Sequence, residues 1–148
     1  IVTVVLGQRK NLPFNGCVQM NKLDILYYDP TTRRVEILDQ DMIVSVHNRD
    51  GRSDDDELVD NLFINNDKKW CDQNFEANGK SRISISVKKP ILIIGVNMVT
   101  SVDFPGRDPK ALEVVSDKSF TKFRCLDDGV RNRTFFIEQV PWGIFKRQ

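Results

Sequence analysis

Short runs of branched and aromatic side chains recur along the chain, and segments rich in turn-forming residues separate them. The run 82–87 alternates strictly: Ile83, Ile85 and Val87 fall on one face, and an arginine and two serines fall on the other. Such alternation predicts a strand with one buried face. The longer run 91–99 is aliphatic without alternation, which predicts a strand covered on both faces.

The remaining predicted strands have the same residue types, and we expect them at 1–6, 22–28, 33–38, 41–46, 111–116, 120–126 and 133–140. Asp29-Pro30-Thr31-Thr32 lies between two of these runs and predicts a hairpin turn. No window sustains a helical period over three turns, and the only alanines are Ala77 and Ala111. The whole pattern predicts an all-β fold, an antiparallel β-sandwich or barrel.

The length and net charge of the chain argue against some classes of binding partner. A chain of 148 residues is one ordinary domain, and its net charge of +1 argues against a nucleic-acid partner. No apolar run approaches the roughly 20 residues that cross a bilayer. A membrane partner is also not expected, because the candidate insertion side chains, Phe14, Phe104 and Trp142, are scattered along the sequence. The hydrophobic and charged contents are those of a soluble globular protein. The chain opens without Met, so we expect a domain of a larger protein, and the absence of a signal-peptide pattern then decides nothing.

The three cysteines, Cys17, Cys71 and Cys125, lie far apart in the sequence. An odd number without close pairs favours buried, reduced thiols over a disulfide framework or a zinc site. The single histidine, His47, excludes a His-rich metal site. Asn132-Arg133-Thr134 matches the N-glycosylation triplet, but a match this short decides nothing about the compartment.

Acidic residues gather in the polar segment that follows the early strands. Asp54, Asp56 and Asp60 are candidate ligands for a structural calcium ion, because hard cations prefer clustered carboxylate and carbonyl oxygens. Their spacing does not match an EF-hand loop, and a solvated acidic turn is the commoner outcome. No other cofactor is expected.

Two aromatic side chains have two interpretations each. Trp70, at the end of a polar segment, is either a core residue at one end of the sandwich or a platform on which a sugar ring stacks. Phe104 belongs to the segment 101–110, which holds two prolines and has few conformations to lose. That segment either connects two strands or binds a ligand, because Phe104 lies beside the hydrogen-bonding groups of Asp103 and Arg107.

The order of several motifs resembles the discoidin-like, coagulation factor 5/8 type C family of galactose-binding-domain-like jelly rolls. The motifs are LFINNDKKW, SRISISV, KKPILIIGVNMV and S-x-D-x-P-x-R-D-P-K, and the resemblance covers Asp41 to Val140. Ile64 and Asn65 replace the Asp-Gly turn that lies near the calcium site of the family, and Leu112 stands where the family often has an aromatic residue. Residues 1–40 lie outside the resemblance; they either add N-terminal strands to a sandwich of residues 41–148, forming one compact unit with it, or form the edge of a preceding module.

The resemblance implies a non-catalytic module that binds a carbohydrate through loops at one end of the sandwich. Its candidate ligand-binding residues are Trp70, Asp103, Phe104, Arg107 and Asp108. The alternative is a structural or protein-interaction domain of a larger intracellular protein, with a protein partner and no small-molecule ligand. The odd cysteine count and the missing Asp-Gly turn favour this alternative. An enzyme is not expected, because no nucleophile or base accompanies His47 in a known signature.

Overall fold

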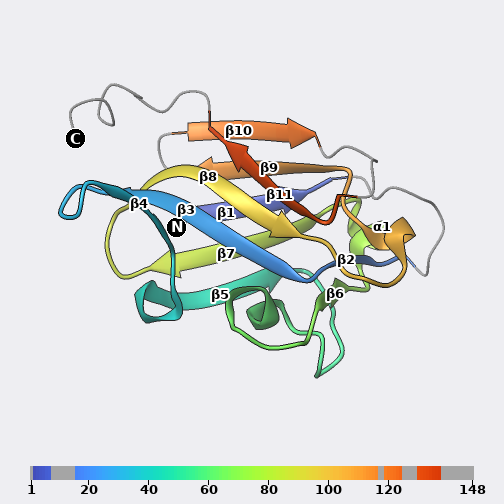
Figure 1. Ribbon diagram of the computed structural model, residues 1–148. Helices are drawn as coiled ribbons and strands as arrows, with labels where there is room; N and C mark the ends of the chain where they lie inside the picture. Colours follow the sequence, from blue (N-terminus) through green and yellow to red (C-terminus); the bar gives the residue numbers. More distant parts are fainter. Residues whose placement is uncertain (1, 8–15, 117–118, 125–129, 138–148) are drawn as a thin grey trace.

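The computed structural model describes residues 2–7, 16–116, 119–124 and 130–137 of the chain. In this part of the chain, two antiparallel sheets pack face to face around a shared apolar core (Figure 1). The prediction of an all-β antiparallel sandwich is therefore confirmed. The finer jelly-roll arrangement stays a prediction.

The larger sheet has the strand order β10-β9-β1-β7-β5. Its strands are β1 (Val2–Leu6), β5 (Ile43–Arg49), β7 (Ser81–Val87), β9 (Ala111–Ser116) and β10 (Ser119–Arg124). The smaller sheet has the order β11-β8-β3-β4. Its strands are β3 (Lys22–Asp29), β4 (Arg34–Ile37), β8 (Leu92–Val99) and β11 (Asn132–Phe136).

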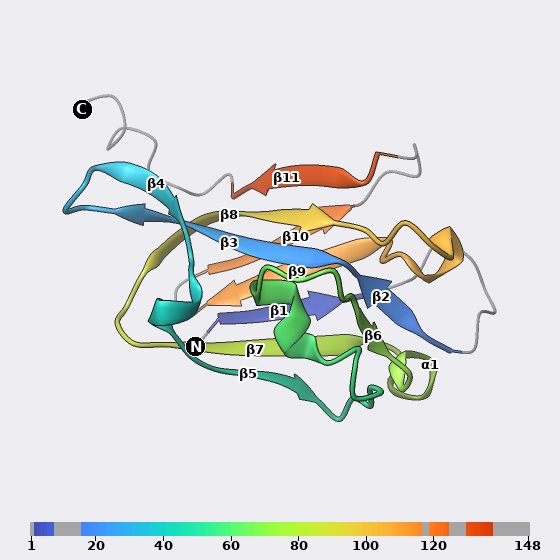
Figure 2. The ribbon, with the colours of Figure 1, turned by 60° about the horizontal axis from the view of Figure 1, so that its bottom comes forward.

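Short elements close the ends and sides of the sandwich. The strands β2 (Val18–Met20) and β6 (Trp70–Asp72) pair with each other, and the helical turns are η1 (Gln40–Met42), η2 (Val59–Phe63), α1 (Phe75–Asn78) and η3 (Pro105–Arg107). The η2 turn packs against β3, β5 and β6 (Figure 2). None of the helices in the described residues is long and apolar enough to cross a membrane.

Each predicted run contains a strand, although the run predicted at 41–46 begins with the helical turn η1. The ends of the runs 120–126 and 133–140 lie outside the described residues. In the first forty residues, β1 pairs with β7 and β9, and β3 pairs with β8. The strands β1, β3 and β4 therefore belong to the same two sheets as the later strands, whereas β2 pairs with β6 in a separate two-stranded sheet.

The core forms where the inward faces of the two sheets meet. Ile83 and Ile85 of β7 are fully buried, as their alternation predicts. In β8 the central residues Ile93 to Val96 are buried, but Asn97 and Val99 are half-exposed. The prediction of burial on both faces thus holds only for the middle of β8, because the outer-face side chains at its C-terminal end are partly exposed to solvent.

Cys17 and Cys71 form a disulfide, with their Cα atoms 6.4 Å apart and a sequence separation of 54 residues. The expectation of reduced thiols was wrong for this pair. The reason is the antiparallel pairing of β2 with β6, in which Gln19 lies opposite Cys71 and Val18 lies opposite Asp72. Cys125 lies outside the described residues.

Removing this cross-link lowers the stability of the fold. In the chain-entropy account, a disulfide that closes a loop of this length stabilises the folded state by about 4 kcal/mol. We expect the double variant Cys17→Ala/Cys71→Ala to lose about that much free energy of unfolding, measured by urea denaturation. The control Cys125→Ala keeps the sensitivity of the wild type to reductant. Three reactive thiols per unfolded, unreduced wild-type chain, instead of one, would contradict the cross-link.

Candidate functional site

The carboxylate of Asp103 lies at the centre of a hydrogen-bond network that joins three segments. It accepts from the Lys69 ammonium at 2.9 Å, from the Ser101 hydroxyl at 2.5 Å and from the Gln19 amide at 3.2 Å. Burial raises the pKa of Asp103, but the hydrogen bonds from Ser101 and Lys69 and the charge of Lys69 outweigh it, so the pKa is lowered overall. The carboxylate is therefore occupied by groups of the chain itself.

Phe104 has an unusual backbone conformation, with φ of 45° in the left-handed region. A residue with a Cβ is strained there and needs support from its surroundings. The Gln19 amide donates to the carbonyl oxygens of Asp103 at 2.7 Å and Phe104 at 3.3 Å. The Arg107 guanidinium lies 4.4 Å and the Lys69 ammonium 5.6 Å from the centre of the Phe104 ring. These contacts fix the loop around a ring that stays 46% exposed.

The structure separates the five predicted ligand-binding residues into two groups. Asp103, Phe104 and Arg107 come together on the loop, whereas Trp70 is 0% exposed and Asp108 is 5% exposed. A fully buried ring cannot stack on a sugar, so the sugar-platform interpretation of Trp70 is wrong and its core interpretation is confirmed. The burial and the internal bonds of this loop indicate a connecting role.

The predicted calcium ligands do not converge. Asp54, Asp56 and Asp60 are all exposed. In the described residues, no group of three or more His, Cys, Asp or Glu side chains could hold a metal ion. A calcium ion at these residues stays a prediction.

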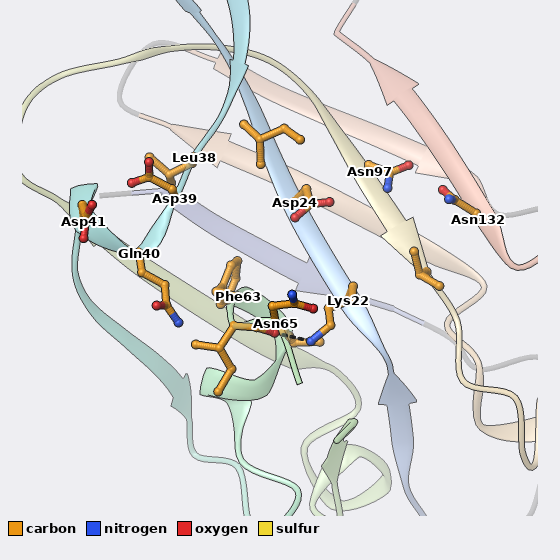
Figure 3. Close-up of a pocket in the computed structure, with 14 residues that line it drawn as sticks. Lys22, Asp24, Leu38, Asp39, Gln40, Asp41, Phe63, Asn65, Asn97 and Asn132 are labelled. Carbon is orange, nitrogen blue, oxygen red and sulfur yellow. Dashed lines mark hydrogen bonds between the residues drawn. The ribbon is translucent and has the colours of Figure 1, made fainter. Parts of the chain in front are cut away.

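The strongest candidate site is an open groove of about 600 Å³ beside the smaller sheet. Inward side chains of β3 such as Leu23 and Ile25 are buried in the core, so Lys22 and Asp24 point to the outer face. Figure 3 shows side chains from β3, β8 and β11 facing the segment between β4 and β5 and the end of η2. The lining is Lys22, Asp24, Ile37, Leu38, Asp39, Gln40, Asp41, Leu62, Phe63, Ile64, Asn65, Asn97, Val99 and Asn132.

A polar row crosses three strands on this outer face. Asp24 lies opposite Asn97, and Asn97 lies opposite Thr134. The Thr134 hydroxyl donates to the Asn97 amide oxygen at 2.8 Å, and Asn97 lies next to Asp24 across the β3–β8 pair. Burial raises the pKa of Asp24, while the hydrogen bond from Asn97 and the charge of Lys22 oppose the rise. The row therefore presents a half-buried carboxylate next to an amide that is bonded to Thr134.

The ammonium of Lys22 holds the wall of the groove in place. It donates to the carbonyl oxygens of Asn61, at 3.0 Å, and Ile64, and to the Asn66 amide oxygen at 3.4 Å. Burial lowers the pKa of Lys22, and the charges of Asp24 and Asp67 oppose this effect. Because its protons are directed at the η2 segment, Lys22 positions the groove wall and leaves the carboxylates to face a ligand.

The lining combines acidic and amide groups with apolar patches. Asp24, Asp39 and Asp41 face a single lysine, so the groove carries an excess of negative charge. Phe63, Ile64 and Val99 provide apolar surface next to these groups. A cavity of a few hundred cubic ångströms with apolar walls and a few fixed polar groups is typical of small-ligand sites.

Sequence reasoning missed this groove. Asp24 and Asn97 each interrupt an apolar strand, and an isolated polar residue in such a run is the signal that could have found them. A second hollow of about 440 Å³, beside the β3–β4 turn, is lined mostly by apolar groups such as Tyr28 and Pro90. It offers fewer polar groups that could orient a ligand.

The network around Asp103 makes the free energy of unfolding depend on pH. A carboxylate with a lowered folded pKa contributes stability above its unfolded pKa of about 4 and loses it as the pH falls through the folded value. We expect Asp103→Asn to be less stable than wild type at neutral pH, with a smaller loss of stability on acidification. Urea unfolding between pH 7 and pH 2 measures this, with the exposed Asp54→Asn as control. Identical pH dependence of Asp103→Asn and wild type would contradict the assignment.

No protein-family model, curated protein or solved structure matches this chain.

Proposed function

We propose that this chain is a non-catalytic binding module whose ligand is a carbohydrate, and that the groove on the smaller sheet receives it. The observation that carries the proposal is the row of Asp24, Asn97 and Thr134 on neighbouring strands, beside the apolar side chains of the groove. The loop at 101–110 is a weaker candidate, because its carboxylate is already bonded to Lys69 and Ser101.

The lining chemistry supports a sugar in particular. Carboxylate and amide oxygens accept from sugar hydroxyls, and the amide NH₂ groups of Asn65 and Asn132 can donate to them. The C–H faces of a sugar ring fit against apolar side chains such as Phe63. The excess of aspartates disfavours sulfated or carboxylated sugars, because like charges repel across an interface. Neutral or amino sugars are therefore the expected class.

The alternative function is a protein-interaction domain. It is favoured by the exposure of Phe104 and of Val102, which is 79% exposed on the same loop. In that case the loop docks a protein partner and the groove holds no sugar.

The disulfide also changes the expected compartment. Cross-links of this kind are typical of chains that fold in oxidising compartments and are rare in reducing ones. We therefore place the domain in an extracellular or other oxidising compartment, in contrast to the intracellular location that the cysteine count favoured.

A glycan array tests both the proposed sugar binding and the position of the binding site on the domain. We expect the folded wild type to bind neutral or amino sugars and to give no signal for sulfated ones. Asp24→Asn and Asn97→Ala should weaken binding about tenfold to a hundredfold, since a hydrogen bond to a charged group contributes about 1.5–3 kcal/mol. Asp54→Asn and Phe104→Ala are the controls outside the groove and should bind as wild type does. An effect of Phe104→Ala alone would place the site on the loop, and a silent array for a folded chain would favour a protein partner.

The raised pKa of Asp24 makes sugar binding depend on pH. The ionised carboxylate is the stronger acceptor, so affinity should fall as the pH drops through the raised pKa of Asp24. Titration calorimetry between pH 4 and pH 8 measures the step for the sugar found on the array. Asp24→Asn should bind weakly and without this step; a step of equal size in the variant would contradict its assignment to Asp24.

A further inference from the structure

Asn132 is an exposed side chain at the start of β11. With Arg133 and Thr134 it forms the only Asn-x-Ser/Thr triplet in the sequence. The strand β11 is at the end of the smaller sheet, where β8 is its partner among the described strands. The triplet thus lies on an edge strand, and the acceptor amide is on the surface of the folded domain.

The Cys17–Cys71 disulfide is an independent observation that bears on this triplet. Disulfides form in the same compartments in which oligosaccharides are transferred to asparagine. In a reducing compartment this triplet would not be glycosylated. In the compartment that the disulfide indicates, it can accept an oligosaccharide. The sequence pattern, the exposure of Asn132 and the cross-link agree.

We propose that Asn132 is an N-glycosylation site. In the transfer, the Asn132 amide nitrogen forms a bond to the anomeric carbon of an oligosaccharide carried on a lipid diphosphate. The bond from that carbon to the diphosphate oxygen breaks, the lipid diphosphate leaves with the electron pair, and the amide nitrogen gives up one proton to a base of the transferase. The chain supplies the acceptor, and the lipid-linked oligosaccharide is the co-substrate.

The folded structure accommodates the glycan. Asn132 is exposed, so an attached sugar displaces no core side chain. An attached glycan would also cover the edge of β11, and a covered edge resists pairing with strands of other molecules. Phe136, on the same strand, is 51% exposed and gains the same protection.

The glycan also bears on the groove, because Asn132 is one of the residues that line it. A sugar attached there occupies the end of the groove at β11 and limits access to Asp24 and Asn97 (Figure 3). This second effect rests on the proposed sugar-binding function. The modification itself does not.

Translation of the chain behind a cleavable secretion leader, in the presence of microsomes, tests the modification. Chains inside the microsomes are identified by their resistance to added protease. We expect wild type and Thr134→Ser, which keeps the triplet, to migrate more slowly than Asn132→Gln, and an endoglycosidase to abolish the difference. Protected wild-type chains that migrate as Asn132→Gln does would overturn the proposal.

The glycan array supplies the second readout, with glycosylated wild type compared with unglycosylated wild type made in a host that forms disulfides but lacks the transferase. A signal that is lost or reduced in the glycosylated chain supports the effect on the groove, and equal signals overturn that effect. If neither chain binds any sugar while the wild type carries the glycan, the proposed sugar function fails and the modification stands.

Discussion

Burial of the inward side chains of β3 and β8 determines the pairing register of the smaller sheet, and the outer face depends on that register. Leu23, Ile25 and Val96 are fully buried between the two sheets. Because side chains alternate between faces, a slip of one residue would move Asp24 into the core and an aliphatic side chain into the groove. The same apolar packing that stabilises the sandwich therefore also positions the polar row.

One glycine allows β8 and β11, two of the three strands of this row, to approach each other. Between Leu26 and Tyr27 the pairing of β3 with β8 shifts by an irregularity, close to Gly95. A Cβ atom at Gly95 would lie 2.4 Å from the carbonyl oxygen of Phe135, so a larger residue would push β11 away from β8. The close approach of these strands brings the Thr134 hydroxyl within reach of Asn97. Backbone geometry thus matters to the groove as much as the polar side chains do.

The sequence was a good guide to features that depend on neighbouring residues and a poor one to features that depend on distant residues. The long strands were predictable because each has its own side-chain pattern. The strands β2 and β6 have three residues each, too few for a pattern, and the disulfide follows from their pairing. The groove was missed because Asp24 and Asn97 come from strands far apart in the sequence. The prolines and charges of the segment 101–110 suggested a binding loop, but its Asp103 carboxylate is bonded to Lys69 and Ser101, which the sequence does not reveal.

The disulfide has a consequence for the integrity of the molecule after proteolysis. It connects β2 with β6, so the β3–β4 hairpin, β5 and the acidic segment around Asp54 all lie within the loop that it closes. A single cut at any exposed point of that loop would leave both fragments covalently attached. In a protease-rich environment the domain could then be nicked in its surface segments and still keep its two halves together, with the sheets in place around the core.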